Sequence, residues 1–211
     1  MIDIGKGTAI VLIPGLQGRW EWMRPAVDAL AKHHRVVSFS LCDEKTSPFK
    51  WELAMAFENY VTQVGAAMDR AGLSQAAIVG VSYGGLIAAE FCARYPERVS
   101  SLVLASALHS GWQPSALQQR YVNAPRLMSP LFAATAPGRM GPEVTAAIPA
   151  FAARWRFMAG QGVRIAMAPA SPTRMARRVV LERTGHIGLV TRPGRFAEIL
   201  GRFVDDTRIP A

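Results

Sequence analysis

With 211 residues, the chain is long enough to bury a sizeable core, and we expect a single domain over residues 1–211. Half of the residues are apolar, which argues against a disordered chain, and the longest apolar runs, such as residues 9–13, are too short to span a bilayer. The net charge of +9 comes from the second half: residues 1–100 hold ten basic and ten acidic side chains, and residues 101–211 hold fourteen arginines and five acids. These arginines are scattered, apart from a cluster at 174–178, and no nucleic-acid-binding motif accompanies them. We therefore expect neither nucleic acid nor a membrane as a partner.

The N-terminus and the cysteines bear on compartment and cofactors. Residues 1–15 lack the basic start and long apolar stretch of a secretory signal, so we expect a cytoplasmic protein. Cys42 and Cys92 are far apart and in no metal-ligand spacing, which predicts buried, reduced thiols. The sequence shows no His and Cys cluster and no phosphate-binding glycine loop, so we expect no metal or nucleotide cofactor.

In chain order, apolar β-branched runs alternate with segments of helical periodicity. The predicted strands are 8–13, 35–41, 76–82 and 99–107, and the predicted helices between and after them are 21–34, 57–72 and 83–96. The strands are continuous apolar runs, as expected for strands buried on both faces. The pattern predicts an α/β fold with a mostly parallel sheet and helices on both faces.

Residues 108–177 interrupt this alternation. The segment is rich in Pro, Ala, Arg, Met and aromatic residues, and its short helical pieces are broken by prolines. Strand and helix patterns resume at 177–186 and at the amphipathic segment 193–206. We interpret 108–177 as a helical cap or lid inserted in the single domain.

A candidate nucleophile lies between the third strand and its following helix. The sequence GVSYG at residues 80–84 fits the G-x-S-x-G pattern, in which a sharp strand-to-helix turn lifts a serine oxygen above the sheet. The pentapeptide alone is weak evidence, but a buried strand before it and a helix after it are the context that the motif requires. Ser82 is therefore the predicted nucleophile, and a glycine-rich turn with an incidental serine is the alternative.

A serine hydroxyl needs a base and a site for the developing negative charge. His186 follows a predicted strand by a short turn and lies C-terminal to Ser82, which makes it the candidate base. The tight turn after the first strand would bring the backbone N–H of Leu16 close to that of Tyr83, and these two donors form the predicted oxyanion hole.

These motifs, in this order, resemble the α/β-hydrolase fold. The resemblance is carried by residues 10–31, 80–107 and 179–204. It implies hydrolysis of esters, amides, epoxides or carbon–carbon bonds, or acyl transfer, and the fold alone does not choose among them. Only seven residues precede the first predicted strand, too few for the opening hairpin typical of the family.

The family also implies a triad acid between the serine and the histidine, and no residue clearly supplies it. The acids in that interval are Glu90, Glu97, Glu143 and Glu182. The first two belong to the helix after the serine, where solvated charge is expected, and at the family's usual place for the acid the chain has Gly162 and Val163. Asp43 is a remote alternative that we interpret as a turn residue. The triad acid is thus unknown, and the chain resembles a hydrolase with a reduced strand count.

The sequence predicts a serine hydrolase of esterase type that acts on an ester or related acyl substrate. Large apolar residues of the middle segment (Trp112, Tyr121, Phe132, Trp155) either line its pocket, which indicates an apolar substrate, or belong to the core. Two alternatives stay open: a weakly active or inactive hydrolase-like binding protein, because the acid is missing, and an acyltransferase that uses the same residues. A lost strand would expose a sheet edge, which a homodimer could cover.

Overall fold

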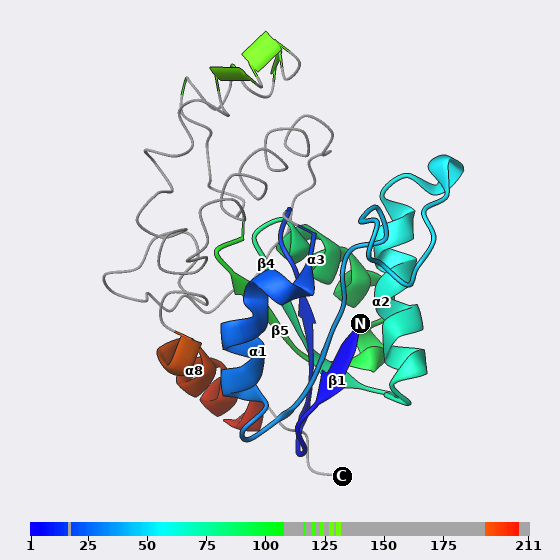
Figure 1. Cartoon of the computed structure of the whole chain (residues 1–211). Coiled ribbons are helices and arrows are strands. Elements are labelled where there is room, and N and C mark those ends of the chain that lie inside the picture. Colours follow the sequence, from blue (N-terminus) through cyan, green and yellow to red (C-terminus); the bar gives the residue numbers. More distant parts are fainter. Residues whose placement is uncertain are drawn as a thin grey trace. The chain divides into compact units, whose positions relative to one another are not determined.

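Figure 1 shows the computed structural model of the chain. The structure describes residues 1–16, 18–107 and 193–206, together with eight further residues in the range 116–131. The chain divides into two units, Met1–Leu108 with Met175–Ala211, and His109–Arg174. The first unit holds all of the strands and helices described below. The predicted cap over 108–177 lies outside the described residues, apart from those eight, and stays a prediction.

The first unit is built on a five-stranded sheet in the order β1-β3-β2-β4-β5. Its strands are β1 (Ile2–Ile4), β2 (Ala9–Ile13), β3 (Arg35–Ser38), β4 (Ala76–Val81) and β5 (Val99–Ala105). β3, β2, β4 and β5 run parallel, with Ile13 opposite Gly80 and Val81 opposite Ala105, and β1 pairs antiparallel with β3. The predicted α/β class and mostly parallel sheet are therefore confirmed.

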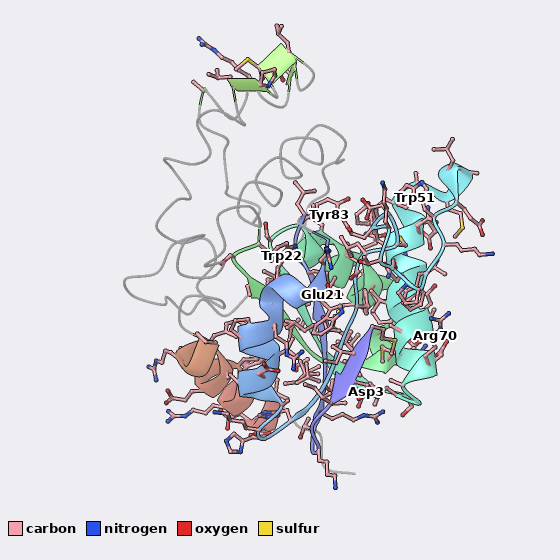
Figure 2. All side chains as sticks on the ribbon, viewed as in Figure 1. Asp3, Glu21, Trp22, Trp51, Arg70 and Tyr83 are labelled. Atoms are coloured by element: carbon pink, nitrogen blue, oxygen red, sulfur yellow. The ribbon has the colours of Figure 1, made fainter. Side chains whose placement is uncertain are left out.

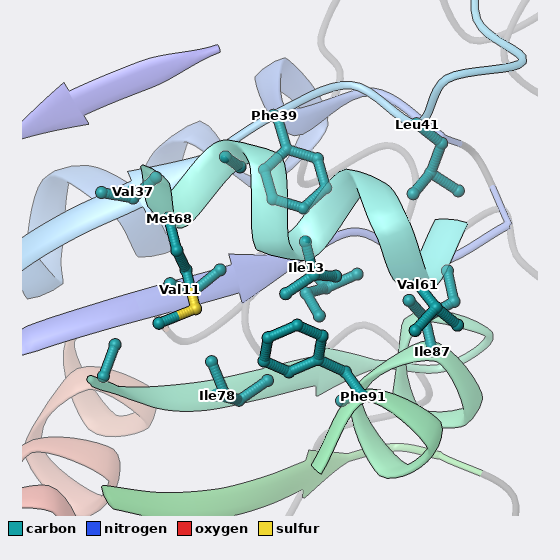
Figure 3. Packing of buried hydrophobic residues seen from close by; sticks show 14 of the residues in the cluster. Val11, Ile13, Val37, Phe39, Leu41, Val61, Met68, Ile78, Ile87 and Phe91 are labelled. Atoms are coloured by element: carbon teal, nitrogen blue, oxygen red, sulfur yellow. The ribbon is translucent and has the colours of Figure 1, made fainter. Parts of the chain in front are cut away.

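One face of the sheet is covered by α2 (Glu58–Arg70) and α3 (Gly84–Arg94). Because successive side chains of a strand point to opposite faces, Val11 and Ile13 of β2 face this layer. They pack with Met68, Ile87 and other fully buried side chains of the two helices, as Figure 3 shows. This layer fixes α3, and hence the turn that precedes it, against the sheet.

The other face is covered by α1 (Arg24–Leu30) and α8 (Pro193–Asp206) (Figure 1). Ile10 and Leu12, the alternate residues of β2, pack here with α1 and with Phe196, Leu200 and Val204 of α8. A short 3-10 helix, η1 (Trp20–Met23), leads into α1, which begins with Pro25 in its first turn, where a missing N–H costs nothing. Two further 3-10 helices, η2 (Leu53–Met55) and η3 (Pro96–Arg98), precede α2 and β5.

The predicted elements of the first half and of 193–206 are present with small changes of boundary. The predicted helix 21–34 begins as η1 and ends at Leu30, and the strand predicted over 35–41 ends at Ser38. The sequence does not predict β1, a three-residue edge strand that pairs with β3 and forms no hairpin with β2. Among the described residues, no helix is long and apolar enough to cross a membrane. The strand predicted within 177–186 lies outside the described residues.

Candidate active site

The turn after β4 holds Ser82 in an unusual backbone conformation. Its φ is +52°, in the left-handed region that non-glycine residues rarely adopt. The turn is fixed by two backbone hydrogen bonds: the N–H of Ser82 donates to the carbonyl of Ala105 (2.9 Å), and the N–H of Gly85 donates to the carbonyl of Ser82 (3.0 Å). A strained serine between a strand and a helix is a frequent feature of functional sites, because only the surrounding structure can maintain the strain.

Close backbone packing explains the glycines around this serine. A Cβ on Gly80 would lie 2.3 Å from the carbonyl oxygen of Gly84, and a Cβ on Gly84 would lie 2.4 Å from the carbonyl oxygen of Pro14. Both atoms belong to the backbone and cannot move aside as a side chain could. The two glycines therefore let α3 begin directly against β4 and against the end of β2, which places Ser82 at the carboxyl edge of the sheet.

The loop after β2 reaches the same edge. β2 and β4 are parallel neighbours, so the residues that follow them leave the sheet side by side. The N–H of Gly18 donates to the carbonyl of Gly15 (2.9 Å), and the N–H of Leu41 donates to the carbonyl of Gly18 (2.6 Å), which ties this turn to the loop after β3. Leu16 packs against the cluster under α2 and α3. The structure thus brings the loop of Leu16 and the turn of Ser82 and Tyr83 to adjacent strand ends.

Tyr83 is buried and meets other aromatic rings edge-on. Its ring centroid lies 6.3 Å from that of Phe57 and 5.8 Å from that of Tyr60, with interplanar angles of 88° and 85°. Removal from water, and then the negative charge of Asp43, raise the pKa of the Tyr83 phenol to about 12, so the phenol is neutral at physiological pH. Figure 2 shows Tyr83 at the same end of the sheet as Trp51.

Asp43, the remote candidate for the triad acid, lies in the loop after β3. Asp43 is exposed. Burial raises the pKa of the Cys42 thiol to about 12, and the negative charge of Asp43 contributes to this shift as it does to that of Tyr83. A carboxylate therefore lies within electrostatic range of the residue next to Ser82. The sequence offers Asp43 as a remote alternative because the loop after the second predicted strand can reach this edge of the sheet, and its role as the triad acid stays a prediction.

Of the other candidate site residues, two lie in the described part of the chain and the rest lie outside it. Glu90 accepts a hydrogen bond from Nε of Arg94 (2.8 Å) on the surface of α3, and Glu97 is exposed in η3, which agrees with the expectation of solvated charge. His186, Glu143, Glu182 and the aromatic residues of the middle segment lie outside the described residues. In the part of the chain that the structure describes, no group of three His, Cys, Asp or Glu side chains could hold a metal ion.

A comparison with family models identifies the class to which this fold and turn belong. The model of the alpha/beta hydrolase fold matches residues 8–158, which is more than half of the chain. The chain therefore belongs to the alpha/beta hydrolase fold family, and the resemblance drawn from the motifs is confirmed.

Individual relatives agree with this assignment. Over 110 residues, 50% of this chain and 40% of the relative, the chain is 28% identical to 2-hydroxy-6-oxo-2,4-heptadienoate hydrolase of Pseudomonas putida. Over 47 residues, 21% of this chain and 12% of the relative, it is 45% identical to homoserine O-acetyltransferase of Thermus thermophilus. The matches thus span less than half the length of these curated relatives. Among solved structures, an esterase from Exiguobacterium antarcticum superimposes with a TM-score of 0.68 at 17% identity, covering 97% of this chain and 94% of the esterase, which shows a shared fold.

Proposed function

We propose that the protein is a serine hydrolase of esterase type, with Ser82 as the nucleophile. The observation that carries the proposal is the left-handed backbone of Ser82 at a strand-to-helix turn whose glycines leave no space for a Cβ. A serine in this conformation is expected to be replaced by glycine unless its hydroxyl has a use. Family membership and the hydrolase and esterase relatives support the reaction class.

In the proposed reaction, the Ser82 Oγ attacks the carbonyl carbon of an ester while His186 removes the hydroxyl proton. The carbonyl oxygen becomes an oxyanion, for which the backbone N–H groups of Leu16 and Tyr83 are the proposed donors. Tyr83 is the N-cap of α3, and the N–H groups at the start of a helix have no acceptor within the helix and favour negative charge. The intermediate collapses, the C–O bond to the alcohol breaks, and the alcohol leaves with the proton from His186. Water, deprotonated by His186, then attacks the acyl carbon. The C–O bond to Ser82 breaks, His186 returns the proton to the Ser82 Oγ, and the acid is released.

The first test follows nitrophenol release from a short-chain nitrophenyl ester. We expect an initial burst and steady turnover in the wild type, and loss of both in Ser82→Ala and His186→Ala, by at least about 10⁴-fold in kcat. Equal release by wild type and a well-folded Ser82→Ala protein would reject the proposal and favour a non-catalytic binding protein.

The same assay addresses the triad acid. Replacing the acid of a triad costs about 10⁴-fold in turnover while the serine and histidine still react slowly. We compare Asp43→Asn and Glu182→Gln, which preserve side-chain shape and remove the charge. The variant that loses turnover by this factor identifies the acid, and unchanged turnover in both would indicate a Ser82–His186 dyad.

Acyl transfer is a second candidate, favoured by the 45% identity to an O-acetyltransferase over 47 residues. The acyl-enzyme is the same, and an alcohol replaces water as the acceptor. Homoserine added to the reaction would then yield an O-acyl product in place of the free acid, which mass spectrometry distinguishes.

A further inference from the structure

The loop between β3 and α2, residues 39–57, is clamped to α2 by two buried amide side chains. Gln63 donates from Nε2 to the carbonyl of Ser40 (2.8 Å) and accepts from the N–H of Cys42 (2.9 Å). One turn earlier, Asn59 donates to the carbonyls of Glu52 (2.7 Å) and Ala56 (2.9 Å) and accepts from the N–H of Glu52 (2.9 Å). Because buried amides fix the backbone groups that they pair with, the loop has a defined shape.

This loop supplies one end of a continuous series of aromatic contacts, which we call the aromatic row: Tyr83, Phe57, Tyr60 and Trp51. Tyr83 meets Phe57 and Tyr60, and the Tyr60 centroid lies 5.2 Å from that of Trp51. Exposure increases along the row, from 9% at Tyr83 to 38% at Trp51. The row therefore runs from the residue beside Ser82 to the protein surface (Figure 2).

An exposed indole that is connected through Tyr60 to Tyr83, the residue after the candidate nucleophile, is a surface that a ligand could cover. Aromatic faces bind apolar and especially aromatic groups through burial and edge-to-face contacts. The negative charge of Asp43 reaches Tyr83 at the inner end of the row, so an anionic group would be repelled there. These two features favour a neutral aromatic occupant.

We propose that the aromatic row binds a neutral aryl group of the substrate and that Trp51 determines this specificity. The inference rests on the proposed function for the identity of the reacting bond, and it adds the class of substrate. The aryl group could belong to the acyl or to the alcohol part of the ester, and the test separates the two.

The kinetic test compares ethyl phenylacetate, benzyl acetate and ethyl acetate as substrates of wild type and Trp51→Ala. Loss of one aromatic contact is expected to raise KM about three- to tenfold for the aryl ester whose ring reaches the row, with kcat nearly unchanged and ethyl acetate unaffected. Trp51→Phe, which keeps an aromatic face, should recover most of the loss. Which of the two aryl esters responds tells which part of the ester carries the ring.

Tyr95 provides a matched control. It is also 38% exposed and also makes one ring contact, with Phe91 at a centroid distance of 5.1 Å, but it lies beyond the far end of α3 from Ser82. Tyr95→Ala should leave all three KM values unchanged. Equal effects of Trp51→Ala and Tyr95→Ala, or none from either, would overturn the inference.

A binding measurement separates this inference from the proposed reaction. In Ser82→Ala protein, ligand-observed NMR should give a lower Kd for phenylacetamide than for acetamide, and adding Trp51→Ala should remove that preference. This result supports aryl binding even if no ester is hydrolysed, in which case only the proposed reaction fails. No preference for phenylacetamide in the Ser82→Ala protein would overturn the inference.

Discussion

The backbone of Ser82 has an energetic consequence that can be measured apart from catalysis. A left-handed conformation costs an L-residue with a Cβ roughly 1–2 kcal/mol, whereas glycine adopts it freely. Ser82 has φ +52° and therefore reduces the stability of the folded state. A residue retained at such a position is better explained by its side chain than by its contribution to folding.

We predict that Ser82→Gly raises the free energy of unfolding by about 1 kcal/mol, because the strain is relieved and the gain is partly offset by the greater freedom of glycine in the unfolded chain. Ser82→Ala keeps the Cβ and should leave stability almost unchanged. Both variants should lose the proposed esterase activity. Urea denaturation measures the difference, and a Ser82→Gly protein no more stable than Ser82→Ala would show that the turn stores no strain.

Among the individual residues of the candidate active site, the sequence predicts some and misses others. The motif and its flanking pattern predict Ser82 in a strand-to-helix turn, because small residues are needed where two backbones approach, and the contacts of Gly80 and Gly84 agree with this. The aromatic row is not predicted. Trp51 and Tyr83 are 32 positions apart, and their connection through Tyr60 depends on the fold of an irregular loop, for which residue patterns carry little information.

Among the elements, α2 does more than cover the sheet. Its buried Gln63 side chain is 2% exposed, and it pairs with the backbone of the loop that follows β3. If Gln63 is changed, the carbonyl of Ser40 and the N–H of Cys42 lose these partners in a region closed to water. A buried polar group without a partner costs about 1–3 kcal/mol.

We therefore predict that Gln63→Leu lowers the free energy of unfolding by about 2–3 kcal/mol, measured by urea denaturation. Hydrogen exchange should also show faster exchange at the Cys42 amide, because its acceptor is gone. A change at an exposed position of the same helix, Thr62→Leu, serves as the control and should leave the Cys42 amide protected. Unchanged exchange in Gln63→Leu would mean that the loop is held without this amide.

The elements that the sequence predicts best are those with strong periodicity. The segment 193–206 is amphipathic throughout, and α8 has these bounds, with Phe196, Leu200 and Val204 buried against α1. β1 is missed because three residues, Ile2 to Ile4, are too few to establish alternation and gain their stability from pairing with β3. Tertiary pairing of this kind is not encoded in a local pattern.

For the molecule as a whole, burial of weakly acidic groups links stability to alkaline pH. Partial burial raises the pKa of the Cys92 thiol from 9.0 to about 12, and burial together with Asp43 raises the pKa of Cys42 and Tyr83 to about 12. Between the unfolded and folded pKa values, the unfolded chain has released these protons and the folded protein still holds them. Stability therefore falls as pH rises, by at most about 1.4 kcal/mol per pH unit for each group.

We predict that the free energy of unfolding is nearly constant from pH 7 to 8.5 and falls by several kcal/mol between pH 9 and 12. The folded state is favoured below the unfolded pKa of 9, and this advantage is lost as pH rises through the folded value near 12. Cys92→Ala removes one of the three groups and should flatten the slope between pH 9 and 11 by about 1 kcal/mol per pH unit. Urea denaturation at pH 8, 9, 10 and 11 measures both slopes. Because burial is the only cause that raises the Cys92 pKa, a Cys92→Ala slope equal to that of the wild type would mean that this thiol is open to water.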